Sequence, residues 1–310
     1  MIGLFKMAFF NVIFLFLSFT YFTKVHYMLR CAIFADIHGK FLLPFKLVYH
    51  YQKITGETID FILQCGDMGI FPNKNTLDKA TLRHAKNNRD ELGFMDDFIV
   101  KNPKIAKFLD ELNIPMIGVR GNHECHDFLD ALENNHANLP YFSVDVYQKV
   151  FICRTGSPFV LTNHQDSLNI LGIGRIGDNK ERDDKRFIQD YEKKHLKYLI
   201  KNPIDIDVLI SHDDYLDSIR GYGMKEINEI LNNIPIAYHF YGHTGEDFYQ
   251  KIHDNQITKS IKIKELEFNQ YGKLQEGCMI ILEKENQAIR IKTVPLYQII
   301  HFDEQHWKIF

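Results

Sequence analysis

Residue types that bind metal ions recur along this sequence, each time directly after a short apolar run. A lone aspartate in that position is often a helix N-cap, and a lone histidine is usually a hydrogen-bonded structural residue. Five such segments in order are hard to obtain by chance, and α/β sheets place their sites where strands end. The segments are DIHG at 36–39, GD at 66–67, RGNHE at 120–124, SHD at 211–213 and GHT at 242–244.

These side chains have the chemistry of a site for two divalent metal ions. Two ions about 3.5–4 Å apart need a bridging carboxylate together with oxygen and imidazole ligands. We expect Asp67 to bridge the ions, with Asp36 and His38 completing one site. The other site would be formed by Asn122, His212 and His243. Ligands of this kind, without thiolate, suit Mn, Fe, Zn or Co in a catalytic site rather than a structural tetrahedral zinc.

Such a pair of ions would activate water. Divalent ions lower the pKa of bound water from about 16 towards about 7, so a bridging hydroxide is a nucleophile at neutral pH. A phosphoryl group held between the ions could then be attacked in line. The chemistry predicted from these residues is therefore hydrolysis of a phosphoric ester.

The elements that must position these residues alternate between short apolar runs and helix-period stretches. Strands are predicted at 29–35, 59–65, 116–119, 168–173, 207–211 and 236–241. Helices are predicted at 42–55, 95–112, 187–200 and 225–233. This βαβ order requires a sheet with helices packed outside it.

The pattern changes in the last part of the chain, where the helical periodicity stops after Tyr241. Further β-like segments are 151–155, 158–162, 277–283 and 288–295, the last two forming a hairpin turned through 284–287. Mixed βαβ structure followed by plain β structure predicts an α/β fold of two sheets face to face, each carrying helices outside. No linker or repeat divides residues 28–310, so we predict one domain there.

The composition is that of an ordinary globular protein. Of the 310 residues, 45% are hydrophobic and 25% charged, which excludes a disordered, collagen-like or multi-span membrane chain. The 37 lysines and arginines against 40 acids give a net charge of −3, so no overall positive field exists to hold nucleic acid nonspecifically. The five cysteines are scattered without a CxxC pair, which favours a reduced, cytoplasmic protein over a disulfide or zinc-knuckle scaffold.

The first 27 residues do not belong to the predicted domain. Residues 7–23 are uncharged and lie between Lys6 and Lys24, at the short limit for a membrane span. Three interpretations stay open: a membrane anchor, sequence upstream of a true start at Met28, or a cleaved signal peptide. A membrane is therefore a partner only where residues 7–23 are translated and retained.

The ordered motifs DIHG, GD, GNHE, SH and GH resemble those of the calcineurin-like metallophosphoesterase superfamily, from Asp36 to His243. The resemblance implies a four-layer α/β/β/α sandwich with a dinuclear metal site at the strand ends. It also implies that His123 protonates the leaving oxygen or contacts the phosphate, with Glu124 behind the ligands. Asp67 would serve catalysis as the bridging ligand.

The last motif departs from the family pattern. The superfamily usually ends in GHxH, and its second histidine, which completes the first metal site, is replaced here by Gly245. The first ion would then be held by two carboxylates, one imidazole and water, as in the protein serine/threonine phosphatases, and would bind more weakly. His239 or Glu246 could take the missing place. That phosphatase branch itself is disfavoured, because the chain reads GDMGIFP at 66–72 where the branch has GDxVDRG.

A closer likeness is to the lariat-debranching enzymes, which cut a 2′–5′ phosphodiester in RNA. Shared features are ETIDFILQCGDMG at 57–69, a polar insertion at 72–93, GNHE, and IDVLISHDDY at 206–215. Those enzymes have cysteine where this chain has Asp36, so nucleotides, RNA and other phosphoesters all stay open as substrates. The insertion would overhang the site, although charge-rich segments such as this one and 178–186 are usually solvated surface. Candidate phosphate contacts are Arg83, His84, Arg89 and Arg175.

The sequence therefore predicts a metal-dependent phosphoesterase, and more specifically a phosphodiesterase. Two alternatives remain: a non-catalytic binding module that keeps the fold, and a membrane-tethered hydrolase of lipid or envelope phosphates. Against the binding module, every predicted ligand position except that of Gly245 is filled. Against the tethered hydrolase, Lys24 lies only a few residues before the strand at 29–35. The pattern makes no prediction of oligomeric state.

Overall fold

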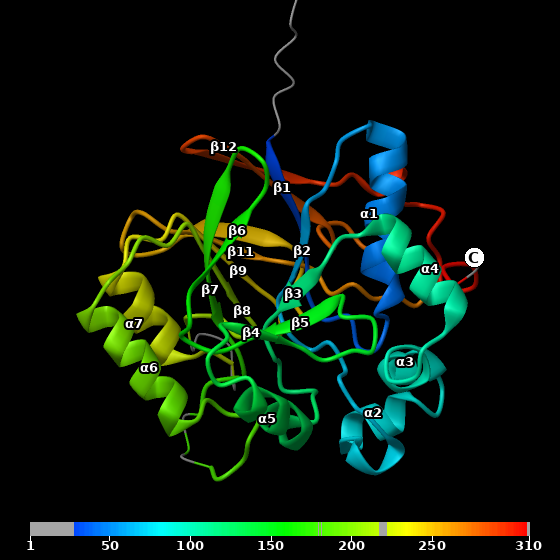
Figure 1. Cartoon of the computed structure of the whole chain (residues 1–310), viewed down its shortest axis with the longest axis horizontal. Coiled ribbons are helices and arrows are strands. Elements are labelled where there is room, and N and C mark those ends of the chain that lie inside the picture. The colour runs from blue at the N-terminus through cyan, green and yellow to red at the C-terminus, as the bar shows by residue number, and fades with distance from the viewer. Residues whose placement is uncertain (1–27, 179, 181, 217–221, 309–310) are drawn as a thin grey trace, which may run out of the picture.

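The computed structural model describes residues 28–178, 180, 182–216 and 222–308 (Figure 1). The segment 1–27, with its predicted anchor, lies outside the described residues. Among the helices that are described, none is both long and apolar enough to cross a bilayer.

Two mixed β-sheets form the centre of the molecule. The first has seven strands in the order β13-β12-β1-β2-β3-β5-β4, and the second has six in the order β10-β11-β9-β8-β7-β6. The strands of the first sheet are β1 (Leu29–Phe34), β2 (Phe61–Gln64), β3 (Met116–Gly118), β4 (Tyr141–Ser143), β5 (Val150–Cys153), β12 (Ile280–Glu285) and β13 (Ala288–Thr293). Those of the second are β6 (Phe159–Thr162), β7 (Ser167–Ile173), β8 (Val208–Ser211), β9 (Tyr238–Tyr241), β10 (Tyr249–Ile252) and β11 (Lys259–Lys262).

Helices cover the outer faces of the two sheets. They are α1 (Leu42–Thr55), α2 (Lys79–His84), α3 (Gly93–Asp97), α4 (Pro103–Leu112), α5 (His126–Asn135), α6 (Asp190–Lys201) and α7 (Lys225–Asn233). In Figure 1, α1 and α4 lie on one side of the molecule, and α6 and α7 lie on the other. Helices α2, α3 and α5 lie below the sheets in the same view.

Three hydrophobic clusters separate the four layers. Consecutive strand residues point to opposite faces of a sheet, and Phe34 accordingly belongs to the cluster under α1 and α4 while Ile33 belongs to the cluster between the sheets. In the second sheet, Ile210 joins the cluster between the sheets while Leu209 packs under α6 and α7. The predicted α/β/β/α sandwich is confirmed.

The central strands of both sheets are parallel, which decides where the polar motifs meet. In the first sheet β1, β2, β3 and β5 run parallel, and in the second β7, β8, β9 and β11 do so. Parallel strands end on the same edge, so the segments after β1, β2 and β3 lie side by side, as do those after β8 and β9. The loops after β1 and β2 continue the pairing, with His38 N donating to Asp67 O at 3.0 Å.

Two predicted elements were wrong in detail. The helix predicted at 95–112 is two helices, α3 and α4, because Pro103 has no backbone N–H to donate and instead begins α4 after the N-cap Asn102. The predicted hairpin forms with a tighter turn than 284–287, since β12 and β13 pair up to Glu285 and Ala288. Asn286 in the turn adopts φ 56°, a left-handed conformation that asparagine tolerates.

Several short elements had no counterpart in the sequence prediction. The polar insertion 72–93 contains α2 and two 3-10 helices, Lys74–Thr76 and Arg89–Leu92. Helix α5 follows the GNHE motif directly, and strands β4, β10 and β11 extend the sheets. Among the described residues no α-helix follows α7, as the loss of helical periodicity after Tyr241 predicted.

Candidate metal centre

The predicted ligands lie at sharp turns directly after the strands. Four of them have left-handed backbone conformations, with φ of 49° at Asp36, 36° at His38, 50° at Asp67 and 66° at His243. Such angles are uncommon for residues other than glycine, and backbone outliers of this kind cluster at functional sites. These turns direct the side chains toward one another at the edge of the sheets.

Five of the six predicted ligands come together in two groups that share one residue. Ligand atoms of Asp36, His38 and Asp67 all lie within 4.8 Å of one another, and so do those of Asp67, His212 and His243. The remaining predicted ligand, Asn122, lies beside the second group, with its Oδ1 3.0 Å from His212 Nε2.

A backbone hydrogen bond on the side of the ring away from the site fixes the orientation of His212. Its Nδ1 donates to the carbonyl oxygen of Cys65 at 2.9 Å, because a carbonyl can only accept. The other ring nitrogen, Nε2, therefore faces the site and lies 3.3 Å from Asp67 Oδ1. A backbone partner that orients a ligating imidazole in this way is typical of protein metal sites.

The site concentrates buried ionisable groups that shift the pKa values of one another. Burial and the neighbouring Asp67 carboxylate raise the pKa of Asp36 to about 7. Burial would also raise the pKa of Asp67, but the charge and hydrogen bond of His212 hold it well below its usual value. The pKa of His212 is raised to about 9 against the effect of burial, because both carboxylates face it. Once an ion displaces the proton of His212, two buried carboxylates with imidazole and amide groups form a donor set that fits divalent ions.

His123 is held as a hydrogen-bond donor beside this site. Its backbone N–H donates to Asp67 Oδ1 at 2.7 Å, and its Nδ1 lies 2.7 Å from Asp78 Oδ2. Burial lowers the pKa of His123, but the Asp78 hydrogen bond and the nearby carboxylates outweigh it and raise the pKa to about 9. Asp78 is the N-cap of α2, where its Oδ1 accepts from Thr81 N at 2.7 Å.

The loop that carries His123 is tied to the loop that carries Asp67. Glu124 accepts hydrogen bonds from the backbone N–H groups of Met68 at 2.8 Å and Ile70 at 2.7 Å. Gly121 permits the close approach, because a Cβ atom there would come within 2.1 Å of Asp67 Oδ1. The shared ligand and the histidine beside it are therefore held as one rigid unit.

The predicted phosphate contacts lie in different settings. Arg175 is fully buried and pairs with Asp130 and Glu192, at 2.8 and 2.9 Å, so its guanidinium is committed to a structural network. Arg89 makes a two-point ion pair with Asp96 at 3.0 Å.

Of the other two, His84 lines a cavity together with His38 and His123. Arg83 lies beside it on α2, with Nη2 3.3 Å from His84 Nε2. A phosphate contact from these two residues stays a prediction.

The residues proposed to replace the missing histidine also have defined settings. His239 is buried, with its ring nitrogens 2.7 Å from Ser211 Oγ and 3.1 Å from Ser260 Oγ, so neither nitrogen is free to bind an ion. Within the part of the chain that the structure describes, no hydrogen bond or ion pair places Glu246 at the site. The structure instead brings a charged segment, 262–267, against the first motif, with Leu266 N donating to Ala35 O at 3.0 Å.

Two charged residues near the site were not among the residues predicted from the sequence. Asp78 lies in the insertion 72–93, where its only signal was its position as a possible helix N-cap. Glu267 lies in the segment after β11, and its carboxylate pairs with Lys40 Nζ at 3.3 Å. Lys40 directly follows the DIHG motif. Its position was the one sequence signal that an acidic partner lies near the site.

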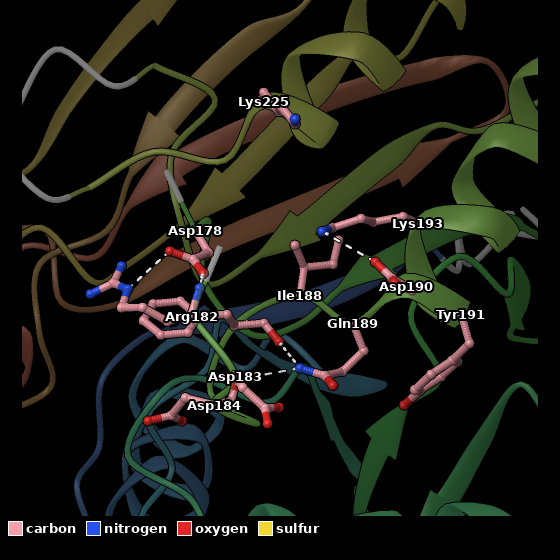
Figure 2. A pocket seen from close by; sticks show the side chains of 11 residues that line it. Asp178, Arg182, Asp183, Asp184, Ile188, Gln189, Asp190, Tyr191, Lys193 and Lys225 are labelled. Carbon is pink, nitrogen blue, oxygen red and sulfur yellow. Dashed lines mark hydrogen bonds and ion pairs between the residues drawn. The ribbon is translucent and has the colours of Figure 1, made fainter. Parts of the chain in front are cut away.

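A separate hollow of about 860 Å³ lies along the charge cluster predicted at 178–186 (Figure 2). In it Arg182 pairs with Asp178 at 2.9 Å, and Lys193 pairs with Asp190 at 3.6 Å. These charges are paired with each other at the surface, which is the ordinary state of a charge-rich segment.

Comparison with known families agrees with this geometry. Residues 29–247 match the model of the calcineurin-like phosphoesterase family, a span that includes every ligand described above. The chain belongs to the calcineurin-like phosphoesterases. This membership makes it a hydrolase of phosphoric esters and implies divalent metal ions, for which the two ligand groups are suited.

Solved structures resemble this calcineurin-like phosphoesterase at low sequence identity. They include TT1561 of Thermus thermophilus (14% identity, 86% of this chain and 100% of that chain, TM-score 0.48). A phosphatase of Mycoplasma pneumoniae (11%, 86% and 92%, 0.45) and a 5′-nucleotidase from Candida albicans (10%, 86% and 52%, 0.42) are also similar. Identities this low carry no information about substrate. No curated protein sequence matches the chain.

Proposed function

We propose that this protein is a phosphodiesterase that uses two divalent ions, Mn, Fe or Zn, bound by the two ligand groups. The observation that carries the proposal is that Asp67 belongs to both groups, as a bridging carboxylate must. Ions bound there would supply Lewis acidity towards the phosphoryl oxygens and a bridging hydroxide for in-line attack on phosphorus. A nucleotide or RNA phosphodiester is the substrate class that we favour.

The residues of the chain divide the remaining work. Asp67 holds the two halves of the centre in register, and its Oδ1 also anchors the backbone of His123. His123 donates its Nδ1–H to Asp78, which leaves Nε2 to deliver a proton to the leaving oxygen. An alkoxide leaving group needs that proton more than a phenolate does, so the His123–Asp78 pair suits esters of alcohols such as ribose.

A comparison of two chromogenic esters tests the proposal. The full chain is stripped of metal, supplied with Mn²⁺, Zn²⁺ or Mg²⁺, and assayed with bis-p-nitrophenyl phosphate beside p-nitrophenyl phosphate. We expect hydrolysis only with metal, and faster cleavage of the diester. Faster cleavage of the monoester would show that the protein is a phosphomonoesterase and not a phosphodiesterase. No hydrolysis with any metal, together with no bound metal by mass spectrometry, would favour the alternative function, a non-catalytic binding module with this fold.

Replacing Asp78 by asparagine tests the pairing with His123. Asparagine is also a good N-cap, so α2 should begin as before, but the charge that raises the His123 pKa is lost. We expect turnover to fall roughly ten- to hundredfold for esters with poor leaving groups. His123 must be protonated to act, so activity falls as pH rises through its pKa of about 9. In Asp78→Asn the alkaline limb of the pH–activity profile should move to lower pH. An unchanged limb would mean that Asp78 does not set the pKa of the general acid.

A further inference from the structure

A cavity of about 230 Å³ opens beside the general acid. Its walls include His38 and His123 from the site, Thr81 and His84 from α2, and the two acids Glu91 and Glu267. In the proposed reaction the leaving group departs next to His123, so this cavity is where that group would lie. The chemistry of its walls therefore bears on which leaving group is accepted.

Glu91 is held firmly against the first motif. It lies in the 3-10 helix Arg89–Leu92, whose backbone packs on Gly39, where a Cβ atom would come within 2.3 Å of Asp90 O and 2.6 Å of Glu91 O. The same short helix is tied to the C-terminal part of the chain, because Trp307 Nε1 donates to Asp90 Oδ2 at 2.9 Å. The position of the Glu91 backbone is thus fixed by packing against Gly39 and by the hydrogen bond from Trp307 to its neighbour Asp90.

The carboxylate of Glu91 differs from the other acids around the cavity. Glu267 pairs with Lys40, whose side chain is 3% exposed, and Asp78 pairs with His123. No residue in the described part of the chain donates a hydrogen bond or an ion pair to the Glu91 carboxylate. Its charged neighbours are Lys40, Glu267, His123 and Asp78, of which Glu267 and His123 also line the cavity, and partial burial raises its pKa to about 7.

A partly buried carboxylate without a donor is costly, and a ligand that supplies one would relieve the cost. Glu267, the other carboxylate that lines the cavity, already has a cationic partner, so a ligand cation would pair with Glu91 and stabilise its negative charge. A hydroxyl group could also donate to Glu91, but it would leave that charge in place. An ammonium group is therefore the better complement.

We propose that Glu91 selects a leaving group that carries an ammonium group. The inference rests on the proposed function, because it assumes that a phosphodiester is cleaved with its leaving group beside His123. The ester would then be bound at both ends, its phosphoryl oxygens at the metal centre and its ammonium group at Glu91. Glu91 acts in this scheme as a specificity residue and takes no part in the bond cleavage.

Three methyl aryl phosphodiesters test the proposal, with a para aminomethyl, hydroxymethyl or methyl group on the leaving phenol. Methoxide leaves far less readily than these phenols, so the aryl group departs in each case. For the wild-type holoenzyme we expect kcat/KM to be roughly tenfold or more higher for the aminomethyl ester than for the methyl ester. In Glu91→Gln this ratio should fall to about one.

Glu111→Gln is the matched control, because it removes the same charge from an exposed position on α4. The ratio should be unchanged in this variant. Equal ratios in wild type and Glu91→Gln, or a wild-type preference for the hydroxymethyl ester, would overturn the ammonium proposal while leaving the phosphodiesterase intact. Failure of the wild type to cleave any of the three esters would overturn the proposed function, and this inference with it.

Discussion

Replacing Asp67 by asparagine is expected to lower turnover about a thousandfold or more while the protein stays folded. Asp67 is the residue shared by the two ligand groups, so its loss weakens both ion sites and the link between them. The stabilisation supplied by such ions amounts to several kcal/mol, and each 1.36 kcal/mol is about tenfold in rate. No other single side chain of the site takes part in both groups.

The fold should survive this change because asparagine is nearly the same shape. Asparagine tolerates the left-handed backbone at this position, where φ is 50°. Its side-chain oxygen can still accept the His123 N–H that Asp67 Oδ1 accepts at 2.7 Å. The loop after β3 should therefore keep its place against the loop after β2.

The measurement is turnover of bis-p-nitrophenyl phosphate together with bound metal by mass spectrometry and thermal unfolding by circular dichroism. Asp110→Asn is the control, since Asp110 is 74% exposed on α4. That variant should keep wild-type activity and metal content. Wild-type turnover in Asp67→Asn, or an unchanged content of two ions, would contradict a centre bridged by this carboxylate.

The proximity of the six predicted ligands could be predicted from the sequence because their positions depend on a simple rule. Each follows an apolar strand, and parallel strands bring their carboxyl ends to one edge. The strands β1, β2, β3, β8 and β9 were predicted within a few residues. The side chains that follow them therefore lie close together, as predicted. The local conformation of Asp36 or His38 did not need to be known for this result.

The residues around the ligands could not be predicted in the same way. Asp78 and Glu91 lie in an insertion whose fold depends on short helices packing against Gly39 and Trp307, over 200 residues apart in the chain. The sequence predicted that this insertion overhangs the site, but nothing in its local pattern shows which of its side chains lie there. Arg175 was predicted as a phosphate contact because it is a polar residue after a strand. Its side chain is instead buried and paired with acidic residues of α5 and α6.

Replacing His123 by alanine is expected to slow esters with poor leaving groups by about 10²–10⁴-fold, the usual contribution of general acid catalysis. Esters with good leaving groups, which depart without a proton, should be affected much less. The fold is expected to tolerate the change, because Asp78 keeps its N-cap bond to Thr81 and Asp67 keeps its bond to the backbone N–H of residue 123.

A series of methyl aryl phosphodiesters with phenols of rising pKa separates this role from a general loss of structure. The dependence of rate on leaving-group pKa should be steeper in His123→Ala than in wild type, while bound metal is unchanged. Asp78→Asn should show a smaller change in the same direction, because it keeps the imidazole and removes only the partner that holds its proton. Equal slowing across the series would mean that His123 binds the phosphoryl group instead, and the acid would then have to be sought among the other groups at the cavity, His84 and Glu91.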